Sequence, residues 1–169
     1  MERGARTELM TDTRIYHEAE AWIREHGLPP MFGGRRFGKR EIQVGLKKDG
    51  RPALHEFDAV AEDGTVVVSI KCGGGRTAGG RAPTGQTRDA YKEVYFLSRT
   101  RAERRILVFG DEELYRVFEK ESDGKRPDGV ELLHVRLPAA MWTRLLTIRK
   151  KAVAEVTPKP DGPKLSDRA

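Results

Sequence analysis

The stretch His55–Cys72, HEFDAVAEDGTVVVSIKC, decides the fold, because it predicts a tight β-hairpin. Asp63-Gly64 is a two-residue turn signal between two β-prone runs, since a type I′ turn needs positive φ at both central residues. Counting outward from this turn gives three facing pairs on the two strands: Val60 with Val67, Asp58 with Ser69, and Glu56 with Lys71.

Because side chains alternate between faces along a strand, this pairing gathers polar residues on one face of the hairpin. The polar face carries Glu56, Asp58, Ser69 and Lys71, and the other face carries Phe57, Ala59, Val68 and Ile70. A lysine and an aspartate at the end of a buried strand are costly unless they are paired or hydrated. The pattern indicates either a functional cluster or a plain surface salt bridge between Glu56 and Lys71.

Composition sets the class of protein. The chain has 169 residues, of which 37% are hydrophobic and 34% charged, which is typical of one globular domain. The net charge of +6 and the pI near 9.6 are compatible with nucleic-acid binding. A single cysteine, Cys72, excludes an internal disulfide and a cysteine-based zinc site. No run is long enough to span a membrane and no apolar segment near Met1 resembles a secretion signal, so we expect a cytoplasmic protein with no membrane partner.

The remaining chain alternates between helical and strand patterns. Residues 1–12 are expected to be frayed, residues 13–156 to form a single α/β domain, and the Pro-rich tail 157–169 to be disordered. Strands are predicted at 41–48, 53–61, 66–72, 104–110 and 130–137. Helices are predicted at 14–26, from Thr84 or Gln86 to Arg99, at 112–120 and from Pro138 onward. The first three strands form a meander, and the strand 104–110 can lie parallel to 66–72 after a helical crossover. This order predicts a mixed central sheet flanked by helices on both faces.

Two loops are rich in glycine and arginine. Residues 33–40 read GGRRFGKR, and residues 73–85 read GGGRTAGGRAPTG. Glycine-rich loops can bind phosphates through backbone N–H groups, but the second loop lacks the Lys-Ser/Thr ending of a P-loop. Its arginines would suit the phosphates of a nucleic acid, and a solvated flexible loop is an equal alternative.

The element order, with Asp58 before the turn and Ser69-Ile70-Lys71 after it, resembles the PD-(D/E)xK nuclease superfamily over about residues 13–137. The resemblance implies a restriction endonuclease-like core. It implies that Asp58 is the central metal ligand and that Lys71 assists the attacking water. The backbone carbonyl of Ile70 and a glutamate of the first helix, for which Glu18 is the best match, would complete the metal site.

Ser69 departs from the family pattern, which has an acid at this position. A serine hydroxyl is a poorer magnesium ligand than a carboxylate, so the candidate substitutes for the acid are Glu56 and Glu18. Gln86 resembles a glutamine that exonuclease-like members carry on the helix after the third strand, although their usual tyrosine is replaced here by Ala90.

The resemblance implies a Mg²⁺- or Mn²⁺-dependent endonuclease acting on DNA, with RNA not excluded and a homodimer compatible with the class. The residues expected to contact nucleic acid are Arg35, Arg36, Lys39, Arg76, Arg81 and Gln86. Two alternatives stay open. One is a degenerate nuclease fold that acts only as a nucleic-acid-binding module. The other is a structural or interaction protein whose basic charge serves solubility.

Overall fold

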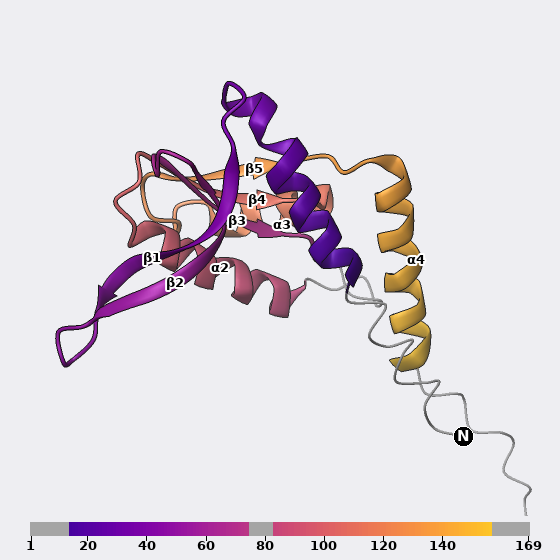
Figure 1. The fold of residues 1–169 in the computed structure, drawn as a ribbon. Helices are drawn as coiled ribbons and strands as arrows, with labels where there is room; N and C mark the ends of the chain where they lie inside the picture. The colour runs from indigo at the N-terminus through magenta and orange to yellow at the C-terminus, as the bar shows by residue number, and fades with distance from the viewer. Residues whose placement is uncertain (1–13, 75–82, 157–169) are drawn as a thin grey trace, which may run out of the picture.

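The computed structural model describes residues 14–74 and 83–156, with side chains through residue 152. Within these ranges the chain forms one five-stranded sheet with the strand order β1-β2-β3-β4-β5 (Figure 1). The strands are β1 (Phe37–Leu46), β2 (Pro52–Ala61), β3 (Val66–Lys71), β4 (Arg104–Phe109) and β5 (Val130–His134). The helices are an N-terminal helix over residues 14–22 with its π-helical end η1 (Ile23–Gly27), the short 3-10 helix η2 (Pro29–Phe32), α2 (Thr84–Ser98), α3 (Glu112–Ser122) and α4 (Ala139–Val156).

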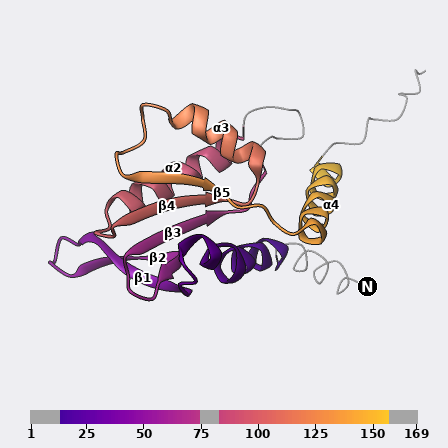
Figure 2. The ribbon, with the colours of Figure 1, turned by 90° about the horizontal axis from the view of Figure 1, so that it is seen from above.

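The sheet is mixed. The first three strands are antiparallel neighbours, whereas β3, β4 and β5 are parallel and are connected through α2 and α3. Helices α2 and α3 cover one face of the sheet, and the N-terminal helix and α4 lie on the other side (Figure 2). This confirms the predicted α/β class, the meander and the parallel pairing of the third and fourth strands. None of the helices in the described ranges is long and apolar enough to cross a membrane.

The first strand is longer than its sequence pattern predicts. Strand β1 begins at Phe37, so the second half of the predicted loop 33–40 is strand, and Phe37 pairs with Ala61 at the end of β2. The alternating apolar pattern begins only at Ile42, because the strand before it is exposed on the edge of the sheet. Edge strands have one unburied side and need no apolar alternation there.

The hairpin register is confirmed next to the turn, but the turn is not the predicted one. Val60 pairs with Val67, as counting from the turn predicts. Gly64 has a φ of 73°, while no non-glycine residue of the described chain has positive φ, which excludes a type I′ turn at Asp63-Gly64. Instead, the N–H of Gly64 donates to the carbonyl of Ala61 and the Asp63 carboxylate accepts the N–H of Thr65 at 3.0 Å. The Val60–Val67 pair forms all the same, but the predicted pairs Asp58–Ser69 and Glu56–Lys71 do not, because the pairing of β2 with β3 ends at Ala59 and Val68.

A β-bulge in β2 changes which residues share a face. Gly38 pairs with Val60 and Arg40 with Phe57, so β2 carries one more residue than β1 between these pairs. Phe57 consequently packs in the core beneath α2, while Ala59 packs in the core on the opposite face. The expectation that Phe57 and Ala59 share one apolar face is therefore wrong, because strict alternation fails across a bulge.

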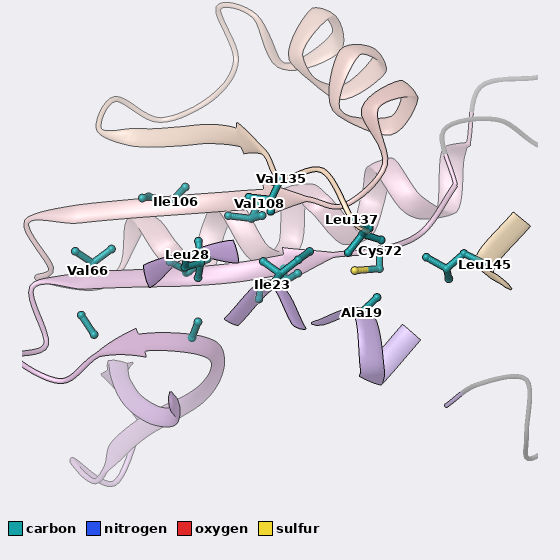
Figure 3. Packing of buried hydrophobic residues seen from close by; sticks show 14 of the residues in the cluster. Ala19, Ile23, Leu28, Val66, Cys72, Ile106, Val108, Val135, Leu137 and Leu145 are labelled. Carbon is teal, nitrogen blue, oxygen red and sulfur yellow. The ribbon is translucent and has the colours of Figure 1, made fainter. Parts of the chain in front are cut away.

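Two hydrophobic cores hold the sheet between its helices. The core under the N-terminal helix and α4 is shown in Figure 3, where Ala19, Ile23, Val66, Ile106, Val108 and Leu145 are among the labelled side chains. The second core packs α2 and α3 on the sheet through Val67, Leu97, Leu107, Phe109 and Phe118. Both cores extend across β3 and β4, whose residues 66–70 and 106–109 are all buried. Strand β3 is thus fixed from both sides.

Helix α4 is attached to the end of the sheet by a buried ion pair. The Arg149 guanidinium donates to the Asp111 carboxylate at 2.6 Å and to the Cys72 carbonyl at 2.8 Å, and only 4% of the Asp111 side chain is exposed. Asp111 also caps α3 by accepting the N–H of Leu114 at 2.8 Å. The buried Asp111–Arg149 pair therefore joins α3 to α4, and Arg149 joins both to the residue after β3 through the Cys72 carbonyl.

Removing the arginine of this pair should be strongly destabilising. We expect Arg149→Ala to lower the free energy of unfolding by about 3 kcal/mol, because the Asp111 carboxylate stays buried without its partner. Arg144→Ala is the matched control: its ion pair with Glu18, at 2.8 Å, is exposed, so its loss should cost less than about 0.5 kcal/mol. Urea denaturation of both variants measures the difference. Equal effects would show that the buried pair is no stronger than the exposed one.

Candidate functional site

The candidate site lies where β2 and β3 separate. Their backbone pairing ends at Ala59 and Val68, and beyond it a side chain takes the place of the partner strand: Asp58 Oδ2 accepts the N–H of Ile70 at 2.7 Å. The bulge in β2 makes this possible, because a bulge redirects a side chain and ends regular pairing. The Asp58 carboxylate is therefore fixed beside β3.

The backbone at Asp58 has a second fixed contact. Arg24 Nη1 donates to the Asp58 carbonyl at 3.3 Å, and only 14% of the Arg24 side chain is exposed. Arg24 belongs to η1, the π-helical turn that ends the N-terminal helix. Single π-helical turns are frequent at functional sites, where they re-aim side chains. The N-terminal helix thus contacts the bulge that carries Asp58.

A glutamate of α2 completes the cluster on the β3 side. Glu93 Oε2 accepts the Ser69 hydroxyl at 2.9 Å, its Oε1 lies 3.7 Å from Lys71 Nζ, and His55 Nε2 lies 3.3 Å from Oε2. The side chains of Glu93 and Lys71 are 13% and 22% exposed, and Ser69 is fully buried. One carboxylate therefore contacts both polar residues of the Ser69-Ile70-Lys71 segment.

Burial and neighbouring carboxylates shift the pKa values of two acids at the site. Burial raises the pKa of Asp58, and the negative charge of Glu93 raises it further, against the opposing effects of the Ile70 N–H and the Lys71 ammonium. Burial also raises the pKa of Glu20, on the N-terminal helix, and the neighbouring Asp58 charge adds to that effect. Three carboxylates from three elements thus lie within electrostatic reach of one another near Lys71, and the positive charge of Lys39 also acts on Asp58 and Glu20.

This crowding predicts a pH-dependent gain in stability on removing one carboxylate. The pKa of Glu20 is raised in the folded state, so its charge costs stability above that pKa and the cost vanishes below the unfolded value near pH 4. We expect Glu20→Gln to unfold at higher urea than the wild type at pH 7, with the difference shrinking as the pH falls to about 4. Glu18→Gln, on the same helix but with an exposed carboxylate, is the control and should not raise the stability at pH 7. A Glu20→Gln variant that is less stable at pH 7 would contradict the prediction.

Of the residues predicted for the catalytic cluster, the structure brings Asp58, Ser69 and Lys71 together around Glu93. Glu18 instead pairs with Arg144 of α4 at 2.8 Å. Glu56 does not face Lys71; it pairs with Glu41 in the sheet register, and its carboxylate lies 3.9 Å from Lys39. The alternative of a Glu56–Lys71 salt bridge is therefore wrong, because β2 and β3 have already separated at that position.

Three members of the cluster were not among the predicted site residues: Glu20, Glu93 and His55. Glu20 follows the buried Ala19 directly, and 23% of its side chain is exposed against 45% for Glu18. Glu93 borders the apolar stripe of α2 that includes Ala90 and Val94. An acidic residue beside a buried apolar stripe can be recognised in the sequence. Which strand its side chain contacts depends on the tertiary fold. His55 also packs against α2, where its ring stacks on Phe96 with ring centroids 3.9 Å apart.

The predicted nucleic-acid contacts have mixed placements. Arg35 is exposed and donates to Thr65 Oγ1 at 2.9 Å, Arg36 is also exposed, and Lys39 extends from β1 near enough to Asp58 to lower its pKa. The Gln86 amide packs directly over Gly73, just beyond β3, where a Cβ atom would collide with it. Arg76 and Arg81 lie outside the described residues.

The donor chemistry of the cluster suits a hard divalent cation. Carboxylate oxygens are the ligands that Mg²⁺ prefers, and Mg²⁺ commonly takes one or two protein carboxylates and keeps several waters. Within residues 14–74 and 83–156 no three His, Cys, Asp or Glu side chains are arranged to ligate one ion directly. The carboxylates of Asp58, Glu20 and Glu93 therefore offer oxygen ligands, of which a Mg²⁺ ion would take one or two.

Comparisons with known proteins do not identify the chain. No family model matches it, and neither the curated proteins nor the solved structures contain a significant match.

Proposed function

We propose that the protein is a Mg²⁺-dependent nuclease of the PD-(D/E)xK type that hydrolyses phosphodiester bonds in DNA. The observation that carries the proposal is the contact between Glu93 and Ser69. Ser69 occupies the position where the resemblance implies an acid, and Glu93 brings a carboxylate to its hydroxyl at 2.9 Å. The missing acid is thus replaced by one from α2, which answers the main departure of the sequence from the family pattern.

The proposed metal ligands are Asp58 together with Glu93 or Glu20. When bound, Mg²⁺ would lower the pKa of a ligated water and polarise a phosphoryl oxygen. Asp58 suits the central position because its Oδ2 is fixed by the Ile70 N–H while Arg24 fixes its backbone carbonyl. Ser69 orients the Glu93 carboxylate by donating to it. These contacts determine ligand positions before any cation arrives, which reduces the reorganisation needed on binding.

Lys71 has a separate role in the proposed reaction. Its ammonium lies 3.7 Å from Glu93, at the end of a strand that is buried on both faces. A lysine is a compact point charge, so Lys71 can orient the attacking water and offset the negative charge that develops on the phosphoryl group. Lys39, whose charge reaches both Asp58 and Glu20, adds a second cation on the β1 side.

A DNA cleavage assay tests the proposal directly. Purified protein incubated with supercoiled plasmid should nick or linearise it with Mg²⁺ or Mn²⁺ and not with EDTA. Lys71→Ala should remove this activity, whereas Lys120→Ala, an exposed lysine of α3, should keep it. Cleavage that survives Lys71→Ala would contradict the proposed role. If the wild type binds DNA but no divalent cation up to millimolar concentration, the alternative of a degenerate binding module is correct.

A further inference from the structure

The hairpin of β1 and β2 extends beyond the rest of the sheet. Each strand is 10 residues long, but the pairing of β2 with β3 ends at Ala59 (Figure 1). The part of β2 from Pro52 to Phe57, which is about 20 Å long at the usual rise per residue of a strand, is therefore not paired with β3. Only one face of this projecting part is covered, because Val44 and Phe57 pack against α2, and Arg99 of the loop after α2 donates to the Val44 carbonyl at 3.1 Å.

The uncovered face of the hairpin carries exposed apolar side chains near its tip. The register pairs Leu46 with Pro52 and Gln43 with Leu54, so these four residues share the face that turns away from α2. Leu46 is 68% exposed and Leu54 is 55% exposed, and both are among the few large hydrophobic residues exposed in the described chain. We refer to Leu46, Pro52 and Leu54 as the tip patch. A contiguous exposed apolar group on a rigid ribbon is typical of an interaction surface.

Two lysines flank the tip patch in the turn between the strands. Lys47 and Lys48 follow Leu46 directly, so the basic charge of the hairpin is concentrated at its tip; over both strands and the turn, residues 37–61, five lysines and arginines stand against four acids. At the tip, the Asp49 carboxylate is already paired with Arg51 at 2.6 Å. Among the residues that the structure describes, no hydrogen bond or ion pair engages the ammonium groups of Lys47 and Lys48. The partner that this charge favours is a polyanion.

We propose that the β1–β2 hairpin is a duplex-binding arm, which inserts into a groove of DNA beside the site that Asp58 marks. A two-stranded ribbon fits the groove of a B-form duplex, and proteins that bend DNA frequently place leucine or proline against base steps. The tip patch contacts sugars and base edges, while Lys47 and Lys48 contact phosphates on either side. The hairpin thus selects double-stranded DNA as the substrate of the proposed nuclease. This inference rests on the proposed function, which makes DNA the partner.

A second copy of the chain is the alternative binding partner for this edge hairpin. Strand β1 is an edge of the sheet, and edge strands can pair with each other. Pairing two copies of this hairpin would bring Lys39, Arg40, Lys47 and Lys48 of each copy together, and like charges directly opposite are unfavourable. The charge therefore favours DNA over self-association.

The test measures DNA binding in EDTA, so that it does not depend on cleavage. Fluorescence anisotropy with a labelled duplex and the matching single strand, over a series of salt concentrations, gives the affinity and its salt dependence. We expect Lys47→Ala/Lys48→Ala to reduce the slope of log K against log salt by about 2, since each lost phosphate contact removes about 0.9. Leu46→Ser/Leu54→Ser should weaken duplex binding at least about fivefold, a loss of about 1 kcal/mol, with no change of slope and little change for the single strand.

The control is Lys120→Ala/Lys125→Ala on the α3 side, which should leave both quantities unchanged. Unaltered duplex affinity and slope in both hairpin variants would overturn the proposal, provided that circular dichroism shows them folded. So would a wild-type dimer in sedimentation that Leu46→Ser/Leu54→Ser converts to monomers without loss of duplex affinity. Hairpin-dependent binding by a wild type that does not cleave with Mg²⁺ would refute the proposed nuclease and leave the duplex-binding arm standing.

Discussion

Asp58→Asn is expected to abolish Mg²⁺-dependent DNA cleavage, by about 10³-fold or more, and at the same time to make the protein more stable at pH 7. The loss of activity follows from the loss of a charged metal ligand. The fold should survive, because an asparagine oxygen can still accept the Ile70 N–H that Asp58 Oδ2 accepts at 2.7 Å. The gain in stability follows from burial, which raises the pKa of Asp58 and makes its charge costly in the folded state.

The two effects have opposite signs, so they separate a functional residue from a structural one. Initial cleavage rates and urea denaturation at pH 7 measure them on the same preparation. Below about pH 4 the stability difference should disappear, because the aspartate is then protonated in both folded and unfolded states. Asp128→Asn, an exposed carboxylate in the loop before β5, is the control and should change neither quantity. If Asp58→Asn keeps full cleavage, Asp58 is not the metal ligand.

Moving the carboxylate of Glu93 to position 69 should restore activity that Glu93→Ala removes. Glu93→Ala alone should lower the cleavage rate about 10²- to 10³-fold, because Ser69 cannot replace a carboxylate. Glu93→Ala/Ser69→Glu moves the carboxylate from position 93 to position 69. Removing the Glu93 side chain leaves room beside the buried Ser69, whose hydroxyl lies 2.9 Å from Glu93. We expect this double variant to recover at least about tenfold, or about 1.4 kcal/mol of transition-state stabilisation.

A charge-free double variant shows whether the recovery needs a carboxylate. Glu93→Ala/Ser69→Gln has nearly the same shape at position 69 and should remain as inactive as Glu93→Ala. Ser69→Glu in the wild-type background should be destabilising, since it places a second carboxylate against Glu93 in a buried position. Equal activity of the two double variants would mean that Glu93 acts only by packing, and the proposed replacement of the missing acid would be wrong.

Much of the fold follows from local patterns. The turn signal near Gly64 and the apolar run of β3 predict the register of Val60 and Val67, even though the turn type differs. Helix α2 and strand β4 are predicted within one or two residues because their apolar periodicity is strong. The bulge between Phe57 and Val60 was not predictable, because no glycine or proline of β2 interrupts the strand pattern there.

The candidate site was predictable only on its strands. Asp58, Ser69 and Lys71 lie on two neighbouring strands, and counting from the turn places them on one face. In the structure the Ile70 N–H and the Glu93 carboxylate bring them together, and the strands are no longer paired at these positions. The helical members depend on where a helix lies against the sheet, which sequence spacing does not encode. The family resemblance points to Glu18 on the first helix, yet the fold brings the charge of Glu20 to Asp58.

The π-helical turn at Ile23–Gly27 constrains the length of the N-terminal helix. Its wider turn sets the angle between Ala19 and Ile23, which pack in the core, and Arg24, which reaches the Asp58 carbonyl. Deleting one residue there to regularise the helix would rotate one group relative to the other by about 100°, the angle per residue of an α-helix. A redesign that idealised this segment would therefore gain a regular helix and detach it from the bulge, so that helical propensity and site geometry cannot be optimised together at this position.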